Sequence, residues 1–282
     1  MNALCRLLCL TGFAFTLTGC LGSSVHPQNG ALGVEVPATT VINALTHAVA
    51  GISIANAKIG DCVTYEENYR INTDPVIMSQ LIKHKLLSIT NGTNTITYNL
   101  FEDYYEFQPS GAIKDEVHRQ LPLEFEEQAP PNNKNLVLSD NPCNGQVRDD
   151  GDGIKYDCIR YFNLETDERA VNAPAAVKQK PNCLGFANCQ IPGQHIMYDA
   201  VKYLKGQEVN KVTIEAHFSR DIPDLFYLRN SDGSYDYTEA STSFCTTTIE
   251  TAPDNTKYLA RFCSVLRDMN TGSTGDCLPP SP

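Results

Sequence analysis

Hydrophobic and polar positions alternate along several stretches of the chain, and a period of two predicts β-strands. The clearest stretch is 212–218, in which every second residue is apolar. Residues 196–200 show the same alternation, and Lys205-Gly206 lies between the two stretches as a turn. We therefore predict that these two strands pair as an antiparallel hairpin. A second C-terminal hairpin is predicted from 243–250 and 257–266.

The N-terminal half contains a strand signal and a hairpin signal of its own. Residues 63–71 are rich in Tyr and Val, which favour a strand. Asn91-Gly92 predicts a type I′ turn, because both residues tolerate positive φ. The apolar and β-branched flanks, 86–90 and 93–98, then predict the two strands of the hairpin.

Two further segments carry helix signals. Apolar residues recur at helical spacing over 41–52, after Thr39 and Thr40, which are suited to cap the start of a helix. Asp74-Pro75 has the form of a helix cap followed by a proline at the first helical position. Residues 76–87 are compatible with either helix or strand, and the sequence leaves that choice open.

The predicted fold is mainly β, with β-sandwich-like antiparallel sheets, a smaller α+β N-terminal region and stabilising disulfides. Residues 128–135, rich in Pro and Asn, mark a boundary. The chain then divides into a signal peptide (1–19), a flexible tether (20–40), a mixed α/β region (41–130) and a β-rich disulfide-containing domain (136–282).

The first twenty residues carry the most specific signal in the sequence. Arg6 precedes an uncharged apolar run, 7–17, which is too short to span a bilayer as a helix. The run ends in Leu17-Thr18-Gly19-Cys20, which resembles the lipobox of bacterial lipoprotein signal peptides position by position. The resemblance implies cleavage before Cys20 and lipidation of that residue by fatty acids such as palmitate. More than one acyl chain gives a stable membrane anchor.

Leu21 follows the lipidated cysteine, and under the sorting rule of enteric bacteria this favours the outer membrane. Removal of Arg6 lowers the basic residues from 22 to 21 against 33 acidic ones, so the net charge changes from −11 to −12. A negative charge of this size repels nucleic acid and anionic lipid surfaces, so we expect no nucleic-acid partner. The sequence contains no phosphate-binding loop or dinucleotide fingerprint, and we expect no cofactor.

Eight cysteines follow Cys20, and an even number in an oxidising compartment predicts disulfides. Spacing alone cannot fix their pairing. Symmetry about a predicted turn at residues 150–151 favours the pair Cys143–Cys158, and symmetry about Asp254 favours Cys245–Cys263. Gly185 allows a small loop to close between Cys183 and Cys189, and elimination then leaves Cys62–Cys277.

Three sets of residues could carry chemistry, and we interpret each as structural. Asp150 and Asp152 match two positions of a calcium loop, but Arg148 and Ile159 occupy positions that need oxygen ligands, so no metal site is predicted. The other two sets are the strand-end residues His217, Ser219 and Asp221, and the aromatic cluster Tyr98, Phe101, Tyr104, Tyr105 and Phe107. The first lies too close along one strand to form a catalytic line. The second suits a glycan or peptide groove, but core packing is favoured.

These observations predict an exported, lipid-anchored protein of the cell envelope, acting as a non-enzymatic binding or structural module. Its partners would be the membrane, through the anchor, and an envelope protein or glycan. An envelope hydrolase with a site assembled from distant residues, and a carrier of hydrophobic ligands, are the alternatives that the sequence leaves open.

Overall fold

A computed structural model describes residues 33–126, 146–149, 154–225, 240–251, 257–272 and 276–277. Antiparallel β-structure dominates these residues, which confirms the predicted fold class. The elements in chain order are β1 (Glu35–Val36), α2 (Ala38–Ala48), η1 (Ile54–Asn56), β2 (Cys62–Ile71), β3 (Ile77–Asn91), β4 (Thr95–Phe107), β5 (Ile113–Glu126), β6 (Arg148–Asp149), β7 (Lys155–Tyr156), β8 (Cys158–Asn172), α3 (Ala175–Lys178), η2 (Pro181–Gly185), η3 (Ala187–Cys189), β9 (Gln190–Leu204), β10 (Gln207–Phe218), β11 (Ser241–Thr251) and β12 (Lys257–Asn270).

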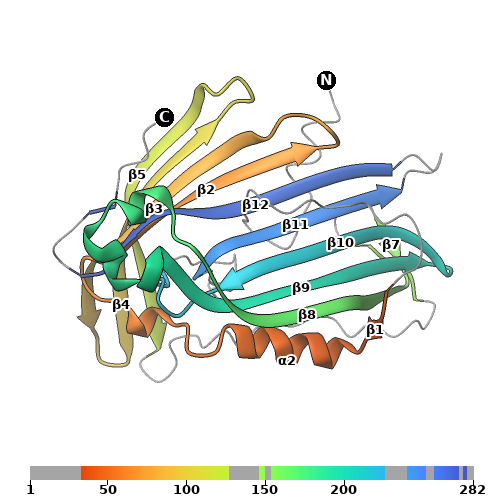
Figure 1. The fold of residues 1–282 in the computed structure, drawn as a ribbon, viewed down its shortest axis with the longest axis horizontal. Helices are drawn as coiled ribbons and strands as arrows, with labels where there is room; N and C mark the ends of the chain where they lie inside the picture. Colours follow the sequence, from red (N-terminus) through yellow and green to blue (C-terminus); the bar gives the residue numbers. More distant parts are fainter. Residues whose placement is uncertain are drawn as a thin grey trace.

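Ten of the strands form one continuous sheet, in the order β1-β8-β9-β10-β11-β12-β2-β3-β4-β5. The short strands β6 and β7 pair with each other. The sheet twists strongly, so that β2–β5 run obliquely to β8–β12 (Figure 1). The described strands therefore make a single curved layer where the sequence suggested sandwich-like sheets. The pairing of β12 with β2 joins the C-terminal strands to the N-terminal ones.

One face of the sheet carries the hydrophobic core, and helix α2 packs against it. The helix lies along β8 and β9 (Figure 1). Its buried side chains are Ala38, Val41, Leu45 and Ala48, which confirms the helical spacing. Pro37 is the N-cap, and no side-chain hydrogen bond caps this end, so the predicted capping by Thr39 and Thr40 was wrong. These two threonines lie in the first turn of the helix.

Both predicted C-terminal hairpins are present. In β9 and β10, Ala200 pairs with Val212, Tyr198 with Ile214 and Ile196 with Ala216. Lys205 and Gly206 connect these strands with φ values of 53° and 80°, which is the left-handed backbone that a tight hairpin requires. Strands β11 and β12 pair as predicted from 243–250 and 257–266.

Three local predictions need correction. Residues 76–87 fall almost entirely within β3, so Asp74-Pro75 does not begin a helix. Asn91-Gly92 does lie at the end of a hairpin, but neither residue has positive φ and Asn91 pairs with Ile96, so the turn is wider than type I′. In β6 and β7, Asp149 pairs with Lys155, which sets a register different from that of a turn at residues 150–151.

Candidate functional site

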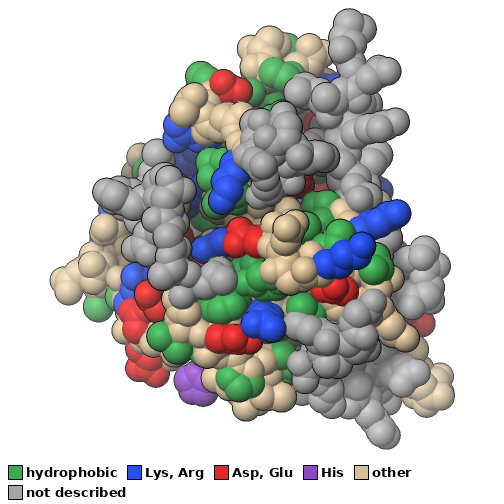
Figure 2. Space-filling view, turned by 90° about the vertical axis from the view of Figure 1, so that its right-hand side faces the viewer, with side chains coloured by type: hydrophobic (Ala, Val, Ile, Leu, Met, Phe, Trp, Pro, Cys, Tyr) green, Lys and Arg blue, Asp and Glu red, His purple; other side chains and the backbone are tan. Residues whose placement is uncertain are grey.

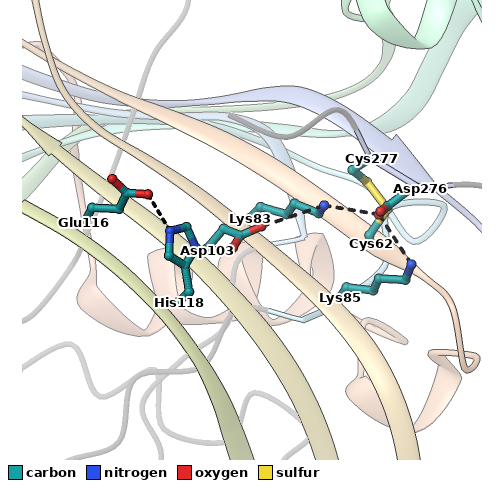
Figure 3. A network of polar contacts seen from close by, with 8 residues as sticks. All are labelled: Cys62, Lys83, Lys85, Asp103, Glu116, His118, Asp276 and Cys277. Carbon is teal, nitrogen blue, oxygen red and sulfur yellow. Dashed lines mark hydrogen bonds and ion pairs between the residues drawn. A yellow bond between two sulfur atoms is a disulfide. The ribbon is translucent and has the colours of Figure 1, made fainter. Parts of the chain in front are cut away.

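A continuous chain of charged side chains crosses β5, β4 and β3 on the face opposite the core (Figure 3). His118 lies between two carboxylates: its Nδ1 is 2.6 Å from Asp103, and its Nε2 is 2.5 Å from Glu116. Both ring nitrogens then donate, which describes the doubly protonated imidazolium. Hydrogen bonds to Asp103 and Glu116 accordingly raise the pKa of His118 above its ordinary value.

The same chain continues through Asp103 to the C-terminal end of the described residues. Lys83 Nζ lies 3.8 Å from Asp103 and 3.2 Å from Asp276, and Lys85 Nζ lies 3.4 Å from Asp276. Partial burial alone raises the pKa of Asp276, but Lys83 and Lys85 outweigh it and hold that pKa below its ordinary value. Because acidic and basic groups alternate, each charge in the chain has an opposite neighbour, and Lys83 can remain buried.

A disulfide and a hydrogen bond hold the C-terminal residues beside the start of β2. Cys62 of β2 and Cys277 are disulfide-bonded, with their Cα atoms 5.9 Å apart (Figure 3). The amide of Gly272 donates to Asp61 Oδ1 over 2.6 Å, and the amide of Lys58 donates to the other oxygen of Asp61 over 2.7 Å. We call the group Cys62, Lys83, Lys85, Asp276 and Cys277 the C-terminal clasp. These contacts attach residues 276–277 to β2 and β3, which is a structural role.

A second polar group lies on the core face of the same strands. His84 Nδ1 is 2.9 Å from the carbonyl oxygen of Leu225, and its Nε2 is 2.9 Å from Glu102. The other oxygen of Glu102 accepts from Arg119 Nε over 2.6 Å. Burial raises the pKa of Glu102, but the hydrogen bonds from His84 and Arg119 outweigh burial and lower it overall. Glu102 is thus held as a carboxylate between His84 and Arg119.

Glu67 behaves in the opposite way on the same face. Its side chain is buried in β2, and desolvation raises the pKa of this carboxyl to about 8. Nearby Tyr104 has a pKa raised to about 12, first by burial and then by the charges of Glu106 and Glu67. Glu67 and Tyr104 are therefore mainly protonated at neutral pH. Pairs of carboxyl groups with opposite pKa shifts occur in acid–base catalysis. Glu67 of β2 and Glu102 of β4, however, are separated by β3, and no nucleophilic side chain connects them among the described contacts.

The predicted strand-end residues do not form a catalytic line. His217 is buried, its Nε2 lies 3.0 Å from the carbonyl oxygen of Arg169, and its Nδ1 lies 2.8 Å from Thr242 Oγ1. Ser219 instead accepts from the amide of Asp221 over 3.2 Å. Nε2 of His217 therefore donates to a carbonyl and Nδ1 accepts from a hydroxyl, so the ring is neutral. Burial lowers the pKa of His217, in agreement with these partners.

Apart from Cys62 and Cys277, the cysteines predicted to pair fall into three groups. Cys183 and Cys189 are disulfide-bonded, and within the loop that they close Leu184, Gly185 and Asn188 have positive φ. Cys158 is disulfide-bonded, and Cys143 lies outside the described residues. Cys245 and Cys263 pair directly across β11 and β12, yet both are present as thiols. The structure thus places this predicted pair in register without the bond that the sequence suggested.

The remaining sequence candidates are dispersed or undescribed. Cys20, Asp150 and Asp152 lie outside the described residues. The aromatic cluster lies on β4, where alternation sends Tyr98 and Tyr104 to the core face and Phe101 and Tyr105 to the other. A single groove lined by all five rings is therefore not formed. Within the described ranges, no three His, Cys, Asp or Glu side chains are placed to hold a metal ion.

Neither the charged chain nor the C-terminal clasp is predicted by the sequence pattern. Asp103, His118 and Lys83 are far apart in sequence, and only the register of three strands aligns them. The one available signal was the alternation of charge along β3 and β4, where Lys83 and Lys85 face the same side as Asp103.

Figure 2 shows another face of the molecule. On this face basic and acidic side chains are interspersed with hydrophobic ones, and the described residues form no large patch of a single charge sign.

None of the helices in the described part of the chain has the length and apolar character needed to cross a membrane. The sequence matches no known protein family and no curated protein. Two solved structures resemble this one weakly. A protein of Bacteroides fragilis, provisionally assigned as exported and with a YmcC-like fold, has a TM-score of 0.29 and 10% identity, covering 76% of this chain and 97% of its own. A provisionally assigned lipoprotein of Parabacteroides distasonis has a TM-score of 0.29 and 8% identity, covering 78% and 99%. Likeness at this level carries no argument about function.

Proposed function

We propose that this chain is an exported lipoprotein, anchored through Cys20, whose curved sheet serves as a non-catalytic binding or structural module of the cell envelope. The observation that carries the proposal is the covalent closure of the fold by Cys62–Cys277. Disulfides persist in oxidising compartments and are rare in a reducing cytosol. The lipobox-like segment at residues 17–20 and the disulfides of the folded part thus both indicate export from the cytosol to an oxidising compartment.

The polar groups of the sheet support a non-catalytic role. The charged chain from Glu116 to Lys85 consists of side chains that neutralise one another. Glu102 is likewise occupied by His84 and Arg119. Catalytic groups normally keep at least one reactive position open to substrate. Such a sheet suits the presentation of a surface to an envelope protein or glycan, and Leu21 favours the outer membrane as its place.

Metabolic labelling tests the anchor. The full chain is expressed in a bacterium grown with radiolabelled palmitate, beside the variants Cys20→Ala and Cys9→Ala. Cys9 lies in the apolar run of the signal segment, so its variant is a matched control for removal of a thiol. We expect label and membrane fractionation for the wild type and Cys9→Ala, and neither for Cys20→Ala. Label that survives Cys20→Ala would contradict the proposal.

A further inference from the structure

Strand β5 lies at one end of the ten-stranded sheet, and among the described residues it is bordered by β4 alone (Figure 1). It is 14 residues long and pairs with β4 from Ile113 to Glu126. A strand of this length at a sheet edge presents a row of backbone N–H and C=O groups to which another strand can add. β5 is therefore a candidate surface for pairing with another chain.

Pro122 shows which backbone groups of β5 point away from β4. Hydrogen-bonded and non-hydrogen-bonded pairs alternate along an antiparallel ladder, and proline has no N–H to donate. Pro122 and Asn99 are therefore a non-hydrogen-bonded pair, and the even-numbered residues of 116–120 occupy the same kind of position. In agreement, the amide of Glu116 donates to the side chain of Asp115 over 2.9 Å instead of to β4. The free edge thus offers the backbone N–H and C=O groups of these even-numbered residues.

The side chains along this edge are complementary to a second copy of the same strand. In an antiparallel pair centred on Val117, each Asp115 faces Arg119 of the other copy, and each Glu116 faces His118 of the other copy. Asp115 is exposed, and the side chains of Glu116, His118 and Arg119 are 46%, 44% and 58% exposed. Opposite charges in directly opposed positions stabilise a pair of strands. The edge therefore matches itself in charge.

Neighbouring registers lack this complementarity. A pair centred on Arg119 sets two arginines against each other, and a pair centred on Asp115 does the same with two aspartates, which destabilises paired strands. A pair centred on Arg119 or Leu121 also requires a hydrogen bond from Pro122, which has no N–H. In the register centred on Val117, Pro122 lies beyond the paired segment. The sequence of β5 thus favours this one register.

We propose that β5 pairs antiparallel with β5 of a second copy of this chain, centred on Val117, so that the sheets of the two copies join into one. The amide of Glu116 then exchanges its bond to Asp115 for a bond to the backbone carbonyl of His118 in the other copy. Arg119 and His118 stay in place, because carboxylates on β4 of their own chain accept a hydrogen bond from each of them over 2.6 Å. This pairing goes beyond the lipid anchor and does not depend on it.

Disulfide cross-linking of the full-length protein in its own membranes tests the register. Val117 faces its own copy across the twofold axis in a non-hydrogen-bonded pair, in which Cα atoms lie about 4.5 Å apart, within reach of a disulfide. We expect Val117→Cys to give a covalent dimer whose link peptide mapping places at position 117 of both chains. Leu121→Cys, on the same face of β5, should stay monomeric. Cross-linking of Leu121→Cys as strong as that of Val117→Cys, or of neither variant, would overturn the proposal.

A charge reversal tests the pairing of Asp115 with Arg119. In the Val117→Cys background, Asp115→Lys should lower the yield of cross-linked dimer about fivefold, because a lysine then faces an arginine in both symmetry-related pairs. Glu165→Lys is the matched control, since Glu165 is exposed on β8, in the other half of the sheet, and the change in charge is the same. Equal yields from the two variants would contradict the pairing.

Sedimentation of the wild-type protein in detergent tests the dimer without an introduced cysteine. We expect a concentration-dependent equilibrium of monomer and dimer, which Asp115→Lys shifts towards the monomer and Glu165→Lys leaves unchanged. A wild type that stays monomeric at every concentration overturns the proposal, even where a cysteine variant fails to fold.

Discussion

At the scale of single residues, partners on neighbouring strands set the protonation of the histidines. His118 faces two carboxylates and keeps its proton, whereas His217 faces a carbonyl and a hydroxyl and stays neutral. The sequence places His217 on a predicted strand and makes no such prediction for His118, and it contains nothing about the groups across from either residue. That information appears only when register aligns distant residues, which is why the charged chain could not be predicted while the alternation of strand faces could.

Glu67 should make stability fall as pH rises. Its pKa is about 8 in the folded protein, above the ordinary value of 4.5, so folding favours the protonated form. The resulting stability is complete below pH 4.5 and is lost as pH rises from 4.5 to about 8, with a loss on the order of 5 kcal/mol at most. We expect Glu67→Gln to flatten this dependence in urea unfolding between pH 5 and 9. The exposed control Glu165→Gln should match the wild type, and equal slopes for all three would refute this reading of Glu67.

Gly193 should be intolerant of any side chain. A Cβ atom there would contact the carbonyl oxygen of Phe218 and approach His217 Cε1 to 2.7 Å. We expect Gly193→Ala to cost about 1–3 kcal/mol through overpacking against buried backbone and ring atoms. Gly111→Ala, where no atom lies within 4 Å, should cost about 1 kcal/mol for its positive φ alone. Thermal unfolding compares the two, and a smaller loss at Gly193 would count against the contact.

At the scale of elements, alternation predicted strands and their partners better than turn motifs predicted turns. The β9–β10 register follows from apolar residues at every second position and one two-residue turn. Asn91-Gly92 failed as a type I′ turn because Asn91 pairs with Ile96, which leaves a longer connection. Asp74-Pro75 failed as a helix start because burial of β3 between β2 and β4 outweighs a local capping signal. Local sequence motifs are overridden where a segment pairs extensively with neighbouring strands.

A substitution in the β9–β10 turn should raise the stability of the protein. Lys205 has φ of 53°, a conformation that asparagine adopts more readily than lysine. We expect Lys205→Asn to raise the free energy of unfolding by about 0.5 kcal/mol, and Gly206→Ala to lower it by about 1 kcal/mol because φ there is 80°. Urea denaturation measures both changes. Destabilisation by Lys205→Asn would show that the lysine side chain contributes more than its backbone strain costs.

At the scale of the whole molecule, one sheet joins the N-terminal and C-terminal parts of the chain. The β12–β2 pairing and the Cys62–Cys277 bond connect sequence-distant segments at the same place. Composition indicated a β-rich, disulfide-containing fold, because an even set of cysteines and strand-forming residues is visible in the sequence. The single-layer topology could not be predicted, because it depends on which strand ends find each other, and no local pattern encodes that choice.

Loss of Cys62–Cys277 should destabilise the protein more than loss of Cys183–Cys189. The separations are 215 and 6 residues, and in the chain-entropy model these loops correspond to about 5 and about 2 kcal/mol. Two double cysteine-to-serine variants, one for each pair, test this in denaturant. The reverse order of stability would mean that the clasp does not restrain the unfolded chain.

The intact mass of the protein extracted from its own membranes tests the central claim most directly. We predict a chain that begins at Cys20, carries the mass of its acyl groups, and retains the bond between Cys62 and Cys277 under non-reducing conditions. A chain that begins at Met1, carries no lipid and has thiols at both of these cysteines would contradict the account.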